Sequence, residues 1–123
     1  MKLRQSERSE QADTAHGSLN GTTSVEIVGE PPAGFTRRIE CVRFVNRDSA
    51  AVTIRLRKTV AGPTHYECDN VVALAVDGKF FPVEVDSVVR LIAGESLTAV
   101  MSGAAATLDP AWISSWVDVP VTV

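Results

Sequence analysis

Apolar and polar residues alternate along most of the chain from Ser24 onward, with the period of two that is typical of half-buried β-strands. The alternation is clearest where threonine and arginine separate Val52, Ile54 and Leu56. Turn residues interrupt it at intervals of roughly 8–12 residues, and no segment has the apolar spacing of a convincing amphipathic helix. The pattern predicts an all-β fold, an antiparallel β-sandwich that is jelly-roll-like or Ig-like.

Two short segments predict how the chain turns. Pro31–Gly34 combines the fixed φ of proline with a glycine that tolerates positive φ, so it predicts a turn. Asp77-Gly78 lies between apolar runs and is the strongest local signal for a tight β-hairpin. Between Thr36 and Val45 both faces carry apolar residues, which predicts a β-bulge near Cys41 or a strand covered on both sides.

The C-terminal segment predicts a long closing strand, although Asp109-Pro110 could instead open a short helix. Ile113, Ser115 and a row of valines occupy one face, so Trp112 and Trp116 fall on the other. Two interpretations of the tryptophans remain open. They are either exposed anchors of an interface, a role in which tryptophan is enriched, or residues packed in the core or under a loop. An exposed aromatic pair would also suit a sugar, which gives a second hypothesis, a carbohydrate- or host-surface-binding β-sandwich module.

The first 23 residues differ in composition from the rest. They are mostly polar, and Leu3 and Leu19 are their large apolar residues beyond Met1. Such a segment buries too little surface to offset its ordering entropy by itself. We therefore expect residues 1–23 to form a polar N-terminal arm held by another subunit, and residues 24–123 to form the β-sandwich domain.

Length and composition limit the remaining classes. A chain of 123 residues with 45% hydrophobic and 22% charged residues is typical of one globular domain. It contains no apolar run of the roughly 18 residues that a membrane helix needs. The first 18 residues have no apolar core of a secretory signal, so we expect a protein made in the cytoplasm, with no membrane partner.

Seven of the twelve basic residues lie between positions 37 and 58, where Glu40 and Asp48 are the acids that offset them. The alternation places this segment in a predicted hairpin, while the chain as a whole has a net charge of −3. A basic hairpin could dock on an acidic neighbour or on the acidic part of an identical subunit. The acidic net charge and the lack of aromatic residues among the arginines argue against nucleic-acid binding. The basic residues are Arg37, Arg38, Arg43, Arg47, Arg55, Arg57 and Lys58.

Catalytic and metal-binding motifs are absent from the sequence. His16 and His65 have no metal-ligand spacing, and Cys41 and Cys68 have no CxxC partners, so we expect two reduced thiols. No nucleophile elbow, P-loop or dinucleotide fingerprint occurs. We therefore expect no enzymatic activity, no cofactor and no metal site.

Residues from about 25 to 123 resemble a recurring type of small structural protein of tailed bacteriophages. The matching features are the Pro32-Ala-Gly34 turn, a strand that ends in the Asn-x-Asp turn of 42–48, and the alternating strand of 51–56. An apolar-x-Ala-Gly-Glu-Ser-Leu step at Leu91–Leu97 and a valine-rich closing strand complete the order. The arginine-rich segment and the polar arm depart from that pattern.

The resemblance implies a non-enzymatic virion component with a β-sandwich fold. Such proteins decorate or cement the capsid, or lie at the head–tail connection and tail. The implied partners are copies of the same chain and other phage structural proteins, such as major capsid, connector or tail subunits. The implied location is the virion, assembled in the cytoplasm of the host bacterium, and Trp112, Trp116 and the seven basic residues are the expected interface.

Overall fold

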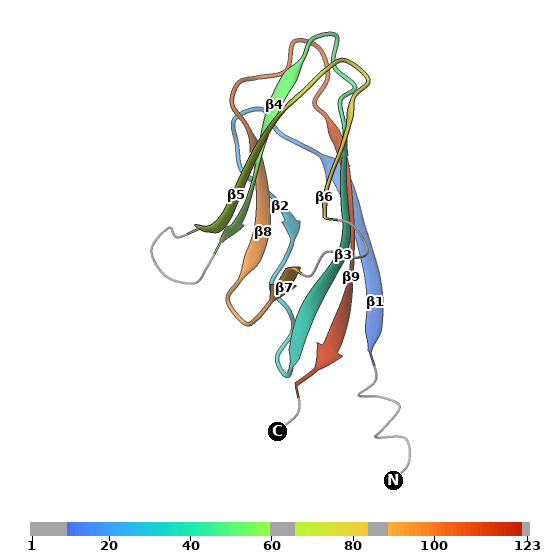
Figure 1. Ribbon diagram of the computed structural model, residues 1–123, viewed down its shortest axis with the longest axis vertical. Helices are drawn as coiled ribbons and strands as arrows, with labels where there is room; N and C mark the ends of the chain where they lie inside the picture. Colours follow the sequence, from blue (N-terminus) through green and yellow to red (C-terminus); the bar gives the residue numbers. More distant parts are fainter. Residues whose placement is uncertain (1–9, 60–65, 84–88, 122–123) are drawn as a thin grey trace.

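Two antiparallel β-sheets packed face to face make up the computed structural model, which describes residues 10–59, 66–83 and 89–121 (Figure 1). One sheet has the order β1-β9-β3-β6, with β7 also paired to β3, and the other has the order β2-β8-β4-β5. No helix in this described part is long and apolar enough to cross a membrane. The strands are β1 (Gln11–Ser18), β2 (Val25–Val28), β3 (Phe35–Val45), β4 (Val52–Thr59), β5 (Tyr66–Leu74), β6 (Lys79–Val83), β7 (Val89–Leu91), β8 (Ser96–Met101) and β9 (Ala111–Pro120).

The strand pairs are nested like a long hairpin that has been rolled up. β4 pairs with β5 in the middle of the chain, β3 pairs with β6 and β7 around them, then β2 with β8, and finally β1 with β9. Two further pairings, β3 with β9 and β4 with β8, join the turns of the roll into two sheets. This is a jelly roll, so the predicted all-β antiparallel sandwich is confirmed in its jelly-roll form.

The core lies between the sheets and follows the sequence alternation. On β4 the residues Val52, Ile54 and Leu56 are buried, and their threonine and arginine neighbours lie outside. β8 follows the same rule, because Leu97, Ala99 and Met101 are buried while Thr98 and Val100 between them are partly exposed. These strands have one wet face each, which is why their sequence pattern was easy to interpret.

A β-bulge in β3 explains its two-sided apolar pattern. The register with β9 shifts between Ile39 and Cys41. Beyond the shift, Val42 and Phe44 face the core as Ile39 does, and all three are fully buried. The predicted bulge near Cys41 is confirmed, and it turns Cys41 to the outer face.

The Asp77-Gly78 turn forms, but it does not make the predicted hairpin. Asp77 has a φ of 61°, and the Gly78 amide donates a hydrogen bond of 2.8 Å to the Ala75 carbonyl. The strands on either side, β5 and β6, belong to different sheets, so the turn carries the chain across the sandwich. The hairpin prediction is wrong because turn chemistry specifies a reversal of direction and not which strands pair.

The predicted boundary between arm and domain at residue 23 is also wrong. β1 pairs with β9 over its whole length, and Leu19 is 2% exposed in the core. The Leu19 amide also donates to the Pro110 carbonyl at 2.9 Å. Backbone pairing holds β1 in place although none of its residues is fully buried, so hydrophobicity alone did not reveal it. Residues 1–9 of the predicted arm lie outside the described part of the chain.

The closing strand is confirmed over Ala111–Pro120, and the alternative helix after Asp109 is wrong. Its tryptophans face inward, with Trp112 9% and Trp116 8% exposed, so they are core residues and not exposed anchors. The residues of the valine row that lie in β9 form its half-exposed outer face. The Trp112 indole fits because the residue of β1 opposite it is Gly17. A Cβ on Gly17 would lie only 3.1 Å from Cζ2 of Trp112.

We expect Gly17→Val to lower the free energy of unfolding by about 1–3 kcal/mol, because the added side chain overpacks the Trp112 indole. Urea denaturation followed by tryptophan fluorescence measures this change. Gly103→Val is the control, since a Cβ at Gly103 meets no atom within 4 Å. Equal stability of the two variants would contradict the close packing of β1 on β9.

Candidate functional site

The seven basic residues do not form a basic hairpin. Three lie on β3, one in the following loop and three on β4, and β3 and β4 belong to opposite sheets. The predicted hairpin is wrong because the chain crosses from one sheet to the other between residues 46 and 51. The basic residues therefore fall into three groups: two form inward ion pairs, one links loops, and the others lie on the outer faces of the two sheets.

Arg37 points into the sandwich and forms a buried ion pair with Asp118. Its Nε and Nη2 donate to Oδ1 and Oδ2 of Asp118 at 2.8 and 3.1 Å, and its Nη1 donates to the Gly29 carbonyl at 3.1 Å. The guanidinium also lies 4.6 Å from the centre of the Trp116 ring, in cation–π geometry. The side chains of Arg37 and Asp118 are 13% and 9% exposed. Arg37 thus stabilises the fold and is removed from the predicted interface.

Lys58 is likewise turned inward, beside the turn between β7 and β8. Its Nζ lies 3.3 Å from Oε1 of Glu95, and both side chains are largely buried. Glu95 also accepts the Ile92 amide at 2.9 Å, which closes the turn before β8. The Gly94 amide in that turn donates to Glu30 at 2.7 Å. The ion pair and these two hydrogen bonds therefore hold together the strands and turns at this end of the sandwich.

Arg38 and Arg43 lie on the outer face of β3. Arg38 donates to Glu40 at 2.9 Å and approaches Glu10 at 3.7 Å. The hydrogen bond and the charge of Glu40 raise the pKa of the Arg38 guanidinium above its ordinary value. Arg43 is exposed and borders a shallow hollow of about 170 Å³, together with Cys41 and Ile113. This face therefore carries Arg38, whose charge is paired with Glu40, the exposed Arg43, and the half-exposed apolar residues of β9.

The loop after β3 is fastened by three successive residues at the other end of the molecule. The Asn46 amide donates to the carbonyls of Leu74 and Ala75, both at 3.1 Å. Arg47 donates to the Asp109 carbonyl and to the Ser18 hydroxyl, each at 2.9 Å. The exposed Arg47 is thus a clamp between loops and the end of β1.

Asp48 holds the loop before β9. Its carboxylate accepts the backbone amides of Ala106, Thr107 and Leu108 at 2.7–3.2 Å, and the Thr107 hydroxyl at 2.9 Å. These hydrogen bonds hold the pKa of the Asp48 carboxyl well below its ordinary value, and the backbone amides of Ala106 and Thr107 contribute most. The Asn-x-Asp turn seen in the sequence is therefore the joint between three loops, which sequence analysis recognised only as turn chemistry.

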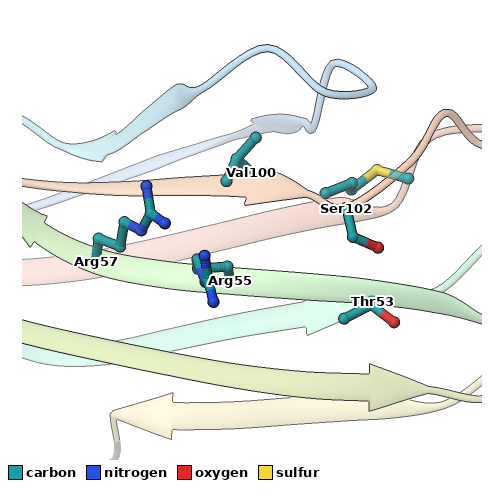
Figure 2. A pocket seen from close by; sticks show the side chains of 6 residues that line it. Thr53, Arg55, Arg57, Val100 and Ser102 are labelled. Atoms are coloured by element: carbon teal, nitrogen blue, oxygen red, sulfur yellow. The ribbon is translucent and has the colours of Figure 1, made fainter.

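Arg55 and Arg57 form the basic part of a surface groove on the outer face of the second sheet. Figure 2 shows both side chains rising from β4, with Val100 on the neighbouring β8 and Ser102 just beyond it. The register places Arg55 opposite Val100 and Arg57 opposite Thr98. The groove encloses about 230 Å³. It is lined by Thr53, Arg55, Arg57, Val100, Met101 and Ser102.

The groove combines two guanidinium groups with hydroxyls and a small apolar surface. Guanidinium groups bind carboxylates with two parallel hydrogen bonds, and hydroxyls can donate or accept. An acidic protein surface is the chemical class of partner that this arrangement suits. Across residues 10–59, 66–83 and 89–121, no three histidine, cysteine or acidic side chains come together in a way that could hold a metal ion.

The remaining candidate residues lie apart from this groove. Trp112 and Trp116 are buried, so the described surface offers no exposed tryptophan pair for a sugar. His16 is exposed on β1, and Cys41 is a free thiol on β3 of the same sheet. His65 and the side chain of Cys68 are outside the described part.

Sequence analysis also missed the edge of the first sheet. β1 is its outermost strand (Figure 1), and it consists of small and polar residues that gave no hydrophobic alternation. Its sequence gave one signal, which is that its eight residues include no proline, lysine or arginine.

Comparison with known proteins supports the fold alone. No family model matches the chain, and no curated protein does. Among solved structures it is similar to a protein of the Bacillus endospore appendages, which are described as a family of disulfide-linked pili. The TM-score is 0.55 at 9% sequence identity, and the match covers 92% of this chain and 88% of the other. At that identity the similarity establishes a shared β-sandwich architecture.

Proposed function

We propose that the protein is a non-enzymatic structural subunit of a bacteriophage virion. It binds and stabilises neighbouring subunits, either as a capsid decoration or cement protein or at the head–tail connection. Its partners are copies of itself and other phage structural proteins, and its location is the virion, assembled in the cytoplasm of the host bacterium.

The observation that carries the proposal is the groove with Arg55 and Arg57 on the outer face of β4 and β8. The two arginines lie two residues apart on β4, a strand paired on both sides, so their backbone positions and the face from which they project are fixed before a partner arrives. Complementary charge sets the orientation and the association rate of two surfaces more than their final affinity. A subunit that must be placed at repeated positions needs that kind of surface.

Three further points support a structural role. The jelly roll is a common frame of viral capsid proteins. The sequence resembles small structural proteins of tailed phages over most of the domain. The similar solved structure comes from pili, which are polymers, and this favours self-association as part of the function.

The fold suits such a role physically. Inward ion pairs close one end of the sandwich, and the Asn46–Asp48 loop fixes the other. The body therefore offers two stiff sheet faces. A ligand that binds only the assembled form of a particle stabilises that form by mass action, in proportion to its affinity and concentration.

The test is retention of the chain on purified phage particles from the bacterium that encodes it. We expect the wild-type chain to co-sediment with particles and the Arg55→Ala, Arg57→Ala double variant to bind at least about tenfold more weakly. That estimate follows because a charge-assisted hydrogen bond contributes about 1.5–3 kcal/mol and 1.4 kcal/mol is tenfold in affinity. Quantitative mass spectrometry of washed particles measures the retained copies.

Arg43→Ala is the matched control, because it removes an exposed arginine from the opposite sheet. Retention that falls with rising salt for the wild type and for the Arg43 variant would support docking by Arg55 and Arg57. Particles that lack the wild-type chain altogether would contradict the proposed function. If the double variant is retained as well as the wild type, the groove is not the surface that binds the particle.

A further inference from the structure

The edges of the two sheets differ in how well they are protected against pairing with another strand. β2 has four residues and a register shift after Glu26, and β7 has three residues. β6 contains Pro82, which has no amide hydrogen, and its register is also shifted. Short strands, bulges and proline are the usual means of protecting an edge. β5, the remaining edge strand, has a register shift opposite Lys58 and Thr59 of β4. β1 has none of these features.

β1 offers an uninterrupted backbone edge eight residues long. It pairs with β9 from Gln11 to Ser18 without a register shift, so the strand is regular throughout. It contains no lysine, arginine or proline. Its outward side chains are small or of moderate size, which leaves the backbone accessible to a further strand. β-Augmentation, the addition of a strand to such an edge, is a recurrent mode of protein recognition.

We infer that β1 pairs antiparallel with the β1 strand of a second copy of this chain, across a two-fold axis beside Thr14. A two-fold interface needs a surface that is complementary to itself. Side chains alternate between the two faces of a strand. If the core-facing side of one copy is to continue into the core-facing side of the other, even-numbered residues must therefore pair with even-numbered residues. With Thr14 opposite Thr14 of the second copy, residues 11–17 all find partners. Threonine pairs directly opposite each other stabilise antiparallel strands.

Charge complementarity favours this register. It places Glu10 of one copy opposite Ser18 of the other. The Ser18 hydroxyl already accepts a hydrogen bond of 2.9 Å from Arg47, so the Arg47 guanidinium would lie close to the Glu10 of the second copy. Glu10 is 57% exposed and only 3.7 Å from its own Arg38. Each end of the paired strands would therefore bring a carboxylate to a guanidinium, twice by symmetry. The same register keeps the two Asp13 carboxylates from lying directly opposite each other, a placement that like charges disfavour.

The consequence is one continuous sheet through both copies, in the order β3-β9-β1 followed by β1-β9-β3 of the second copy. The groove with Arg55 and Arg57 lies on the other sheet and stays open in such a dimer. The inference rests on the proposed structural role and specifies how two copies of the subunit join.

The first experiment measures the mass of the full-length chain in solution by sedimentation velocity over a range of concentrations. We expect a dimer, and we expect Thr14→Lys to weaken it by at least about tenfold, because two ammonium groups would then face each other across the axis. Thr22→Lys is the control, since Thr22 is exposed in the loop after β1 and adds the same charge away from the edge. Circular dichroism checks that both variants keep the strand content of the wild type.

The second experiment tests the register with Thr14→Cys in a chain that also carries Cys41→Ser and Cys68→Ser. Directly opposed residues have Cβ atoms close enough for a disulfide, so mild oxidation should yield a covalent dimer. The matched variant is His16→Cys, two residues along the same face. Faster cross-linking at position 16, or a dimer that survives Thr14→Lys, would overturn the inference, as would a monomeric wild type at the highest soluble concentration.

The outcomes separate the inference from the proposed function. A chain that pairs through β1 but is absent from phage particles keeps the inference and overturns the function. A chain found on particles while monomeric and indifferent to Thr14→Lys keeps the function and overturns the inference.

Discussion

Replacing Arg37 with methionine is expected to lower the free energy of unfolding by about 3–5 kcal/mol, because it leaves the Asp118 carboxylate buried without a partner. The Gly29 carbonyl loses its donor and the Trp116 ring loses the guanidinium in the same step. Urea denaturation with tryptophan fluorescence measures the loss directly, since Trp116 reports on the site.

The double variant Arg37→Met, Asp118→Leu serves as the control. It removes both charges and replaces them with apolar side chains of similar length, so most of the lost stability should return. A double variant that is less stable than Arg37→Met alone would contradict this interpretation. It would mean that the ion pair itself, with its hydrogen bond to Gly29, is worth more than the burial of two apolar groups.

Asp48→Asn is expected to be the most damaging single change in the loops. An amide cannot accept from the amides of Ala106, Thr107 and Leu108 as strongly as a carboxylate does, and its own NH₂ group would face them. We expect a clear fall in the midpoint of thermal unfolding at pH 7. The exposed Asp77→Asn change, in a turn where asparagine tolerates the positive φ, should leave the midpoint nearly unchanged.

The pH dependence of the Asp48 effect has a defined sign. The folded state holds the pKa of this carboxyl below its ordinary value of 3.8. The stabilisation is therefore complete above that ordinary value and is lost as the pH falls toward the folded pKa. Wild type and Asp48→Asn should differ most near neutral pH and converge below about pH 4. A difference that grows on acidification would contradict the network around Asp48.

The strands could be predicted from the sequence, but their pairing could not. On β4 the alternation correctly predicted which face points into the core, because Val52, Ile54 and Leu56 all lie on one face. On β9 both faces carry large apolar residues, so alternation did not indicate which face points into the core. The tryptophan face points inward because Gly17, which is distant in the sequence, leaves room for Trp112. The Asp77-Gly78 turn joins two sheets for a similar reason, since long-range pairing decides which strands meet.

The candidate site was predictable only in part. Composition located the basic residues, and two of them, Arg55 and Arg57, do share a surface. The sequence could not indicate that Arg37 and Lys58 turn inward, because their carboxylate partners Asp118 and Glu95 are distant in the chain. β1 escaped notice because main-chain hydrogen bonds, and not its side chains, make it a strand.

The nested strand order also sets the order in which the chain can fold as it is synthesised. β1 leaves the ribosome first, yet its only strand partner in the described part of the chain, β9, is the last to be made. Translation at about 5–20 residues per second leaves β1 waiting for several seconds beside the nascent chains of neighbouring ribosomes. The central β4–β5 pair can form early, and the β1–β9 pair must form last. A polar, soluble β1 is well suited to that delay, because a hydrophobic strand left waiting would aggregate.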